Sequence, residues 1–328
     1  MKVLITGANG FLGSWLVDRL VAQGDDVTVL LRNIDRSDNY KKRNINVVQG
    51  DITDLESLKT ATHGQDQVYH LAGLVAYNRR EREIMQKINV DGTANILEAS
   101  VFAKVKRILL VSSVVSVGAT FTPEVLNEES SFELTKYHLG YHETKRQAEA
   151  LLRRYVADGK VDGVIVNPST IYGAGDASKS SRSTQLKVAR GEMFSYPSGG
   201  VSIVAVEDVI EGMLSAMQKG RSGERYILSG ENLTLKEVFD RIADIAGVAR
   251  PWLPVPALVL KGLAKIDDLM ACVGKSGPLP SERALVALMY HWYDASKARQ
   301  ELGFTTRPAQ QALENSVNWM SQQGLLRN

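Results

Sequence analysis

The sequence predicts an α/β fold with a doubly wound parallel sheet and a second, smaller part that is mainly helical. In the first half of the chain, short apolar runs alternate regularly with stretches of helical periodicity, a pattern typical of βαβ crossovers. A glycine-rich turn, T-G-A-N-G-F-L-G, directly follows the first apolar run and opens the first helical stretch. The composition over 328 residues, 44% hydrophobic and 23% charged, is that of a globular protein and not of a disordered one.

The elements of the first half follow from this alternation in order. We expect strands at residues 3–5, 27–31, 45–48, 67–71, 107–111 and 161–166, and helices at 11–21, 55–61, 81–102 and 141–156. Strands linked by helices are parallel and covered on both faces, which is the Rossmann-type arrangement. We therefore predict a Rossmann domain over residues 1–173, with its ligand beyond the carboxyl ends of the strands.

The alternation ends after Gly173. Residues 174–183 are rich in Ser and Gly and predict a loop, and two further strand-like runs at 201–206 and 225–228 are expected to return to the Rossmann sheet. The last hundred residues are mostly helical in pattern, with a capping signal at Thr234-Leu-Lys-Glu237. We expect residues 174–328 to form a mainly helical substrate-binding part.

Composition also limits the class of function. The formal net charge of +2 gives no reason to expect nucleic acid or an anionic membrane as a partner. The single cysteine, Cys272, allows no disulfide within the chain and no cysteine metal cluster, and we predict no metal site. The sequence shows no signal peptide and no apolar window long enough to span a membrane, so we expect a cytoplasmic protein.

The glycine turn predicts a site for the phosphates of a nicotinamide dinucleotide. Gly7 permits a tight turn, Gly10 lets the backbone approach a pyrophosphate, and Gly13 lets the helix pack close to the strand. The N-terminus of the helix adds free N–H groups and a partial positive charge. A purely structural strand-to-helix turn is the alternative.

Later motifs give the chain a resemblance to a known family. The spacing T-G-x-x-G-x-x-G at residues 6–13, H-L-A-G at 70–73, N-V-D-G-T at 89–93, S-S-V-V-S-V-G at 112–118 and Y-H-E-T-K at 141–145 occur in one order. Together they resemble the extended short-chain dehydrogenase/reductase superfamily, in particular its dihydroflavonol 4-reductase-like and NAD-dependent epimerase/dehydratase members. The segment at 166–174 departs from that pattern, with Asn167 in place of Arg and Ala174 in place of Pro.

We predict NADP as the cofactor, with NAD as the less favoured alternative. The second strand ends at Leu31-Arg32, where an acidic residue would bind the ribose of NAD, and Arg36 lies nearby. A guanidinium suits a 2′-phosphate, although a solvated surface arginine is also possible. The resemblance and the turn imply that these residues contact the dinucleotide: Thr6, Gly7, Asn9, Gly10, Phe11, Leu12, Gly13, Arg32, Arg36, Asp51, Ile52, Leu71, Ala72, Gly73, Asn89, Val111, Tyr141, Lys145, Pro168 and Ser169. A helix N-cap role for Asp51 or Asp54 and a structural role for Asn89 remain open.

The candidate catalytic residues are Ser113, Tyr141 and Lys145. Positions i and i+4 share a helix face, so the phenol of Tyr141 and the ammonium of Lys145 can share one site, and the cation is expected to lower the pKa of the phenol. The resemblance places the third member, a serine hydroxyl, at Ser113. The alternatives are Ser112 and Ser116 for the hydroxyl and Tyr137 for the phenol, and we expect the neighbouring histidines 138 and 142 to be surface residues.

The resemblance implies an NADPH-dependent reductase of a ketone or aldehyde, similar to dihydroflavonol 4-reductases. A nucleotide-sugar epimerase is the alternative, and it would need arginines for a diphosphate, for which the candidates are Arg182, Arg190, Arg225 and Arg283. A sugar 4,6-dehydratase is disfavoured because Val114-Val115 stands where those enzymes carry Asp-Glu. A hydroxysteroid dehydrogenase and a non-catalytic NADP-binding regulator remain open, as does a homodimer through the helices at 81–102 and 141–156. The substrate is expected to meet residues 119–140, 174–200 and 252–290.

Overall fold

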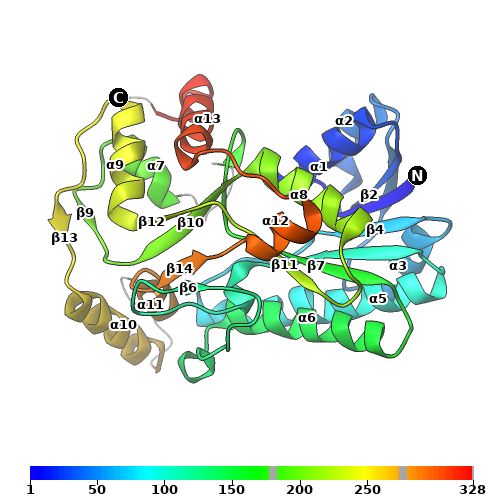
Figure 1. Cartoon of the computed structure of the whole chain (residues 1–328), viewed down its shortest axis with the longest axis horizontal. Helices are drawn as coiled ribbons and strands as arrows, with labels where there is room; N and C mark the ends of the chain where they lie inside the picture. The colour runs from blue at the N-terminus through cyan, green and yellow to red at the C-terminus, as the bar shows by residue number, and fades with distance from the viewer. Residues whose placement is uncertain (177–182, 273–278, 327–328) are drawn as a thin grey trace.

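A seven-stranded parallel sheet forms the centre of the computed structural model, which describes residues 1–176, 183–272 and 279–326 (Figure 1). Its strands are β1 (Lys2–Thr6), β2 (Asp26–Leu31), β3 (Asn46–Gln49), β4 (Gln67–His70), β5 (Arg107–Val111), β7 (Gly163–Pro168) and β11 (Arg225–Leu228). The order is β11-β7-β5-β4-β1-β2-β3, and every neighbouring pair is parallel. The chain changes direction across the sheet between β1 and β4, where doubly wound sheets bind ligands. The predicted Rossmann-type fold is confirmed.

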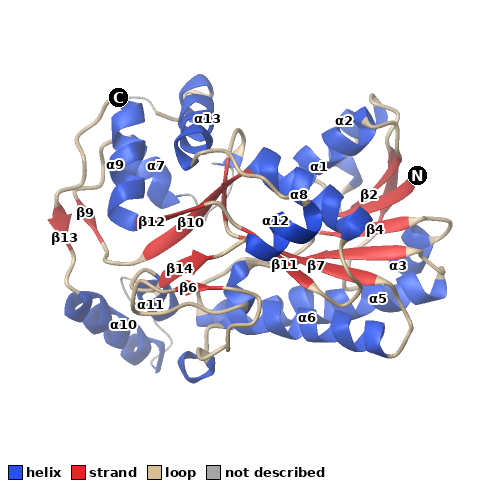
Figure 2. Cartoon of the chain, viewed as in Figure 1, coloured by secondary structure: helices blue, strands red, loops and turns tan. Residues whose placement is uncertain are grey.

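Helices cover both faces of this sheet, as Figure 2 shows. One layer contains α1 (Phe11–Ala22), α2 (Asp38–Lys41), α8 (Val206–Lys219) and α12 (Ser296–Leu302). The other contains α3 (Leu55–Thr62), α5 (Gly92–Phe102) and α6 (Gly140–Ala157). The apolar side chains of the inner strands are therefore enclosed, which explains why these strands read as nearly continuous hydrophobic runs, whereas the edge strand β3 is only partly buried.

The long helix expected at residues 81–102 is not a uniform α-helix. A 3₁₀ turn at Arg79–Glu81 leads into α4 (Arg82–Met85), and a π-helical segment at Gln86–Asp91 follows before α5 begins. A π-helical insertion changes the direction in which the side chains of one turn point, and such insertions occur often at functional sites. Here the segment carries Asn89, one of the predicted site residues.

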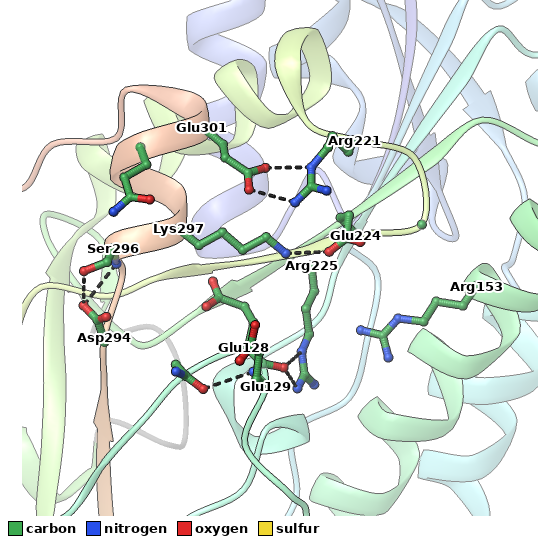
Figure 3. A pocket seen from close by; sticks show the side chains of 13 residues that line it. Glu128, Glu129, Arg153, Arg221, Glu224, Arg225, Asp294, Ser296, Lys297 and Glu301 are labelled. Atoms are coloured by element: carbon green, nitrogen blue, oxygen red, sulfur yellow. Dashed lines mark hydrogen bonds and ion pairs between the residues drawn. The ribbon is translucent and has the colours of Figure 1, made fainter.

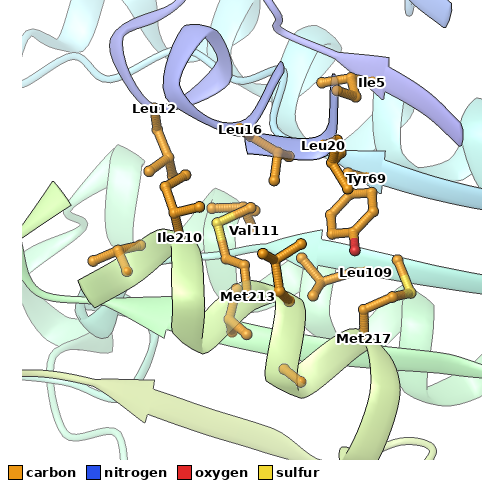
Figure 4. Packing of buried hydrophobic residues seen from close by; sticks show 14 of the residues in the cluster. Ile5, Leu12, Leu16, Leu20, Tyr69, Leu109, Val111, Ile210, Met213 and Met217 are labelled. Carbon is orange, nitrogen blue, oxygen red and sulfur yellow. The ribbon is translucent and has the colours of Figure 1, made fainter. Parts of the chain in front are cut away.

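The larger part of the core lies between the sheet and the α1–α8 layer (Figure 4). Leu16 and Leu20 of α1 belong to the same packed cluster as Ile210, Met213 and Met217 of α8, over the strand residues Leu109 and Val111. Leu16 and Met213 are fully buried. Because α1 begins at the glycine turn, this packing also fixes the position of that turn against the sheet.

The remaining elements build a second, smaller layer around a mixed sheet of order β12-β10-β14-β6, with β8 joined to β10. Its strands are β6 (Val125–Leu126), β8 (Thr170–Tyr172), β10 (Gly200–Ala205), β12 (Glu231–Thr234) and β14 (Tyr290–Tyr293), and β9 (Ser195–Tyr196) pairs separately with β13 (Leu253–Pro254). The helices are α7 (Ser183–Ala189), α9 (Leu235–Ala246), α10 (Ala257–Cys272), α11 (Ser281–Val286) and α13 (Ala309–Gln322). The predicted capping box of Thr234 and Glu237 opens α9.

One strand expectation is wrong. The run at 201–206 was expected in the Rossmann sheet, but it forms β10 and pairs with β8, β12 and β14 in the second sheet. Only the run at 225–228 joins the seven-stranded sheet, at its edge beside β7. An apolar run of this length fits either sheet, so its sequence alone does not select its partners. Among the described helices, none has both the length and the apolar character that crossing a bilayer requires.

We expect Leu16→Ala to lower the free energy of unfolding by about 2–5 kcal/mol, because it leaves a cavity between α1 and α8 where the leucine is 0% exposed. Leu258→Ala is the matched control, since the same atoms are removed from a side chain that is 82% exposed. Urea unfolding followed by circular dichroism measures both. Equal losses in the two variants would contradict the packing described here.

Candidate active site

The glycine turn is a place where the backbone approaches itself too closely for any side chain. Gly7 has a φ of +76°, and a Cβ there would lie 2.8 Å from the backbone nitrogen of Ala72. A Cβ on Gly13 would lie 2.2 Å from the carbonyl oxygen of Gly7, well inside van der Waals contact. The turn is closed by a hydrogen bond from the Gly10 N–H to the Gly7 carbonyl at 2.9 Å. The exposed backbone between β1 and α1 therefore fits a phosphate group of a dinucleotide.

A buried histidine connects this turn to the neighbouring strand. His70 Nδ1 lies 2.8 Å from Thr6 Oγ1, and Nε2 lies 3.3 Å from Thr93 Oγ1. Thr6 Oγ1 also accepts the N–H of Ala72 at 3.2 Å. Burial and then the charge of Lys145 lower the pKa of His70 to about 3, so the ring is neutral at physiological pH. The ends of β1 and β4 and the start of α5 are thus fixed to one another.

Two further predicted dinucleotide contacts, Arg32 and Asp51, follow the strands β2 and β3 on the same side of β1. Arg32 is exposed directly after β2, while Asp51 accepts the N–H and hydroxyl of Thr53 at 2.8 and 2.9 Å and does not cap a helix. Asp54 is the residue that caps α3. The side chain of Arg36 lies outside the described residues.

Asn89 joins the loop after β4 to the helix that carries Tyr141. Its Oδ1 accepts the Leu74 N–H at 2.7 Å, and its Nδ2 donates to the Leu74 carbonyl at 2.9 Å and to Thr144 Oγ1 at 3.1 Å. A Cβ placed on Gly73 would lie 3.2 Å from Asn89 Oδ1 and 3.3 Å from Lys145 Nζ. Gly73, Asn89 and Lys145 therefore meet at one point, and a larger residue at position 73 would crowd both side chains.

The structure brings the three candidate catalytic side chains together. Tyr141 lies in the first turn of α6, and a hydrogen bond joins its phenol to Ser113. Ser113 follows β5 by two residues and caps a short 3₁₀ turn, Val114–Ser116. One turn along α6, Lys145 donates from Nζ to the Val111 carbonyl at 3.0 Å. The end of β5 and the start of α6 thus place a hydroxyl, a phenol and an ammonium group in one region.

We expected Lys145 to lower the pKa of Tyr141, but in the structure the pKa of this phenol is raised. Burial raises the pKa of Tyr141 well above its usual value, Tyr77 raises it further, and the hydrogen bond with Ser113 lowers it. The ring of Tyr77 packs edge-on against Tyr141 with 6.0 Å between centroids. Because the phenol is only 7% exposed, removal from water dominates. Tyr141 therefore holds its proton and suits the role of a proton donor.

The alternative hydroxyls and the alternative phenol are engaged elsewhere. Ser116 is buried and lies 2.5 Å from a carboxylate oxygen of Glu149, and Ser112 is buried with its hydroxyl 3.4 Å from that of Ser116. Tyr137 packs against the ring of Phe121 at 5.4 Å. Of the three serines, Ser113 is the one whose hydroxyl lowers the pKa of the Tyr141 phenol.

His142 corrects a second expectation, because it is completely buried while His138 is exposed as expected. The ring of His142 lies 5.9 Å from that of His291 on β14. Neither ring nitrogen of His142, nor Nε2 of His291, has a hydrogen-bond partner among the described residues. Burial lowers the pKa of both histidines, to about 4 for His291. The helix turns position 142 away from the site and into the contact between α6 and the second sheet.

Two residues that contact the site had no signal in the sequence. The first is Tyr77, which packs against Tyr141. The second is Glu282 in α11, whose buried carboxylate accepts the N–H of Gly140, at the start of α6, at 3.2 Å. The same carboxylate accepts Nε of Arg82 at 3.0 Å. The C-terminal part of the chain thus holds the helix that carries Tyr141. The two residues in contact are 142 positions apart in the sequence, so no local sequence pattern predicts this contact.

A cavity of about 720 Å³ lies at a different place, between the loop at 127–129, the start of β11 and α12 (Figure 3). Charged side chains line it, and they pair with one another: Arg221 with Glu301 at 2.8 Å and Lys297 with Glu224 at 2.5 Å. None of the predicted catalytic residues lines this cavity. Its charges are largely compensated by one another, so we assign it a structural role.

Three of the four candidate diphosphate arginines, all of them described, bind different parts of the chain. Arg225 donates to the Glu128 carbonyl, Arg190 to the Leu325 carbonyl, and Arg283 to the hydroxyls of Ser183 and Thr184. Arg182 lies outside the described residues.

Comparison with known proteins places the sequence and the fold in one family. The sequence model of the NAD dependent epimerase/dehydratase family matches residues 3–229. A putative dihydroflavonol 4-reductase of Synechocystis is 32% identical over 98% of this chain and 95% of its own length, and sterol demethylase protein B of Methylococcus capsulatus is 29% identical over 99% and 100%. The crystal structure of gox2253 superimposes with a TM-score of 0.88 at 30% identity over 99% of both chains. A nucleoside-diphosphate-sugar epimerase from Pseudomonas aeruginosa shares the fold, with a TM-score of 0.80 at 24% identity over 100% of this chain and 99% of its own.

The buried histidines make stability depend on pH. A histidine in an unfolded chain titrates near pH 6.5, above the lowered pKa values of His142 and His291, so below that pH the unfolded state binds more protons. The free energy of unfolding should have its full value above pH 6.5 and should fall as the pH drops towards 4. His142→Leu should reduce this slope by about 0.7 kcal/mol per pH unit at pH 6.5 and by about 1.4 kcal/mol per pH unit near pH 5.

The measurement is urea unfolding at half-unit steps between pH 6.5 and 5. His138→Leu is the control, because its side chain is 70% exposed and its slope should match the wild type. Identical slopes for the wild type and His142→Leu would contradict the burial of a neutral ring at position 142.

Proposed function

We propose, from the premise that the chain belongs to the NAD dependent epimerase/dehydratase family, that it is an NADPH-dependent reductase of a ketone or aldehyde carbonyl in a small-to-medium organic substrate. The observation that carries this proposal is that Ser113, Tyr141 and Lys145 meet at the carboxyl end of β5. Ser113 lies close enough to the phenol to lower its pKa, and Lys145, one helical turn from Tyr141, donates to the Val111 carbonyl at 3.0 Å. The full-length similarity to a putative dihydroflavonol 4-reductase supports the same reaction class.

In the proposed mechanism, Tyr141 is the acid. The buried phenol carries its proton at neutral pH and can give it to the substrate oxygen as negative charge develops there. The Ser113 hydroxyl donates a hydrogen bond to the same oxygen and fixes its position. When bound, NADPH supplies the hydride that reduces the carbonyl carbon.

Lys145 and the loop after β7 complete the proposed site. Lys145 is held by the Val111 carbonyl close to Gly73, where it can reach a ribose hydroxyl and favour the phenolate that remains after proton transfer. Pro168 and Ser169 follow at the end of β7, and the buried Ser169 hydroxyl has no partner among the described residues. Such a group fits a polar ligand such as the carboxamide of a nicotinamide.

For the cofactor we propose NADP over NAD. Arg32 is exposed at the end of β2, and no acidic side chain stands at that position to bind the two ribose hydroxyls of NAD. The remaining predicted contacts, from the glycine turn to Ser169, serve either dinucleotide.

Two other reactions of this family receive less support. A sugar 4,6-dehydratase needs acidic groups beside the catalytic hydroxyl, and here Val114 and Val115 are buried in apolar clusters. A nucleotide-sugar epimerase remains the second candidate, because a nucleoside-diphosphate-sugar epimerase shares this fold. Against it, Arg225 is committed to Glu128 and Glu149.

A non-catalytic NADP-binding protein would not need the Ser113–Tyr141 contact. A homodimer through α5 and α6 stays a prediction.

We expect Tyr141→Phe to lower kcat by about 10²- to 10⁴-fold, because it removes the proton donor. The loss of NADPH absorbance in the presence of each of a series of aldehydes, ketones and flavanonols measures turnover. Quenching of tryptophan fluorescence measures NADPH affinity, which should change less than about threefold. Tyr155→Phe, farther along α6, is the matched control and should retain wild-type turnover. Full activity in Tyr141→Phe would refute the mechanism, and tightly retained cofactor without NADPH consumption by the wild type would favour the epimerase.

We expect Arg32→Ser to weaken NADPH binding about ten- to a hundredfold while leaving NADH binding unchanged, because a charge-assisted hydrogen bond to the 2′-phosphate contributes about 1.5–3 kcal/mol. Calorimetric titration of both cofactors measures this. Arg154→Ser, an exposed arginine on α6, should alter neither affinity. Wild-type protein that binds NADH as tightly as NADPH would overturn the assignment.

A further inference from the structure

A carboxylate that the proposed chemistry does not use is buried behind the active site. Glu149 lies two turns after Tyr141 on α6 and is 1% exposed. One carboxylate oxygen lies 2.5 Å from Ser116 Oγ and accepts Asn167 Nδ2 at 2.6 Å. Removing a charged group from water is costly, so a buried carboxylate with two short hydrogen bonds indicates a specific task.

Both partners of Glu149 also contact the backbone of Ser113. Asn167 Nδ2 donates to the Ser113 carbonyl at 3.0 Å, and Ser116 Oγ lies 2.8 Å from the same oxygen. The Asn167 amide nitrogen therefore meets three acceptors, namely the Ser113 carbonyl, Ser116 Oγ at 2.9 Å and the Glu149 carboxylate. Three acceptors around one nitrogen fix which way this amide points.

These contacts hold the short turn on which Ser113 is mounted. The Ser113 carbonyl also accepts the backbone N–H of Ser116 at 3.1 Å, which closes the 3₁₀ turn Val114–Ser116. A single 3₁₀ turn has weak hydrogen-bond geometry of its own, so it needs support from outside. Asn167 and Ser116 provide that support at the residue whose hydroxyl meets Tyr141.

An arginine at the edge of the sheet holds the other side of Glu149. Arg225 at the start of β11 lies 3.6 Å from the second carboxylate oxygen and is fixed by the Glu128 carbonyl at 3.1 Å. Figure 3 shows Arg225 beside Glu128 in the charged cavity described above. Arg153, one turn after Glu149, lies 3.5 Å from the same oxygen. The carboxylate is thus held between cations on one side and the Ser113 turn on the other.

We propose that Glu149 and Asn167 are positioning residues that act through the Ser113 carbonyl to aim the Ser113 hydroxyl at the substrate oxygen. This inference rests on the proposed function, because Ser113 is its catalytic residue. Small errors in the direction of a catalytic group can cost about a hundredfold in rate. The effect should therefore appear in kcat and not in cofactor affinity.

The test compares Asn167→Ala, Glu149→Leu and the conservative Glu149→Gln, each alone and together with Ser113→Ala. We expect the first two to lower kcat about tenfold with NADPH affinity unchanged within threefold, and Glu149→Gln, which still accepts hydrogen bonds, to retain at least a third of wild-type kcat. In the Ser113→Ala background the same changes should lower kcat no further, since the group that they aim is absent. Losses that add to that of Ser113→Ala would overturn the proposal.

A second measurement separates this inference from the proposed function. Hydrogen exchange of a peptide covering residues 112–118 should become faster in Asn167→Ala, while a peptide covering β1 should exchange at the wild-type rate. Unchanged exchange at 112–118 overturns the inference whatever the activity. Faster exchange in a protein that reduces no carbonyl refutes the proposed function and leaves the support of the turn established. If Asn167→Ala fails to fold, Ser116→Ala removes one donor to the same carbonyl with the loss of a single oxygen and gives the same comparison.

Discussion

The parallel pairing of β4 with β1 and β5 is the constraint on which the rest of the structure depends. Parallel strands end at the same edge of a sheet, so the glycine turn after β1, Gly73 after β4 and Ser113 after β5 all lie at one edge. His70 fixes this arrangement through Thr6 and Thr93 at the point where the chain changes direction across the sheet. The helix α6 then needs only to lie along the sheet for Tyr141 and Lys145 to reach the same place.

Removal from water sets the chemical state of the groups at this edge of the sheet. Tyr141 keeps its proton because its phenol is enclosed by Tyr77, Val115 and Met85, and this effect exceeds that of the hydrogen bond from Ser113. His70 stays neutral for the same reason. The buried polar groups next to the proposed reaction centre are therefore matched to one another by direct hydrogen bonds, which are stronger and more directional in such surroundings than at the surface.

The sequence was sufficient where a local pattern has one structural solution. Alternating strands and helices, three close glycines and a Tyr–Lys pair one turn apart predict a Rossmann fold, a turn and a shared helix face, because each pattern is set by neighbours in the chain. The run that forms β10 was placed in the wrong sheet because strand pairing depends on distant partners, here β12 and β14. The burial of His142 was missed for a similar reason, since β14 covers that side of α6 and lies about 150 positions away in the sequence. Glu282 and Tyr77 carry no local signal at all.

The contact between Glu282 and the start of α6 has a consequence for how such proteins can diverge. Because a residue from the C-terminal part holds the Gly140 N–H and Arg82 at once, the part that would recognise the substrate is mechanically tied to the helix that carries Tyr141. A chimaera that combines the first half of this chain with the second half of a relative would inherit a working pocket only if position 282 and position 82 remain compatible. New specificities in this lineage would then arise more readily by point changes around a kept acidic anchor than by exchange of whole segments.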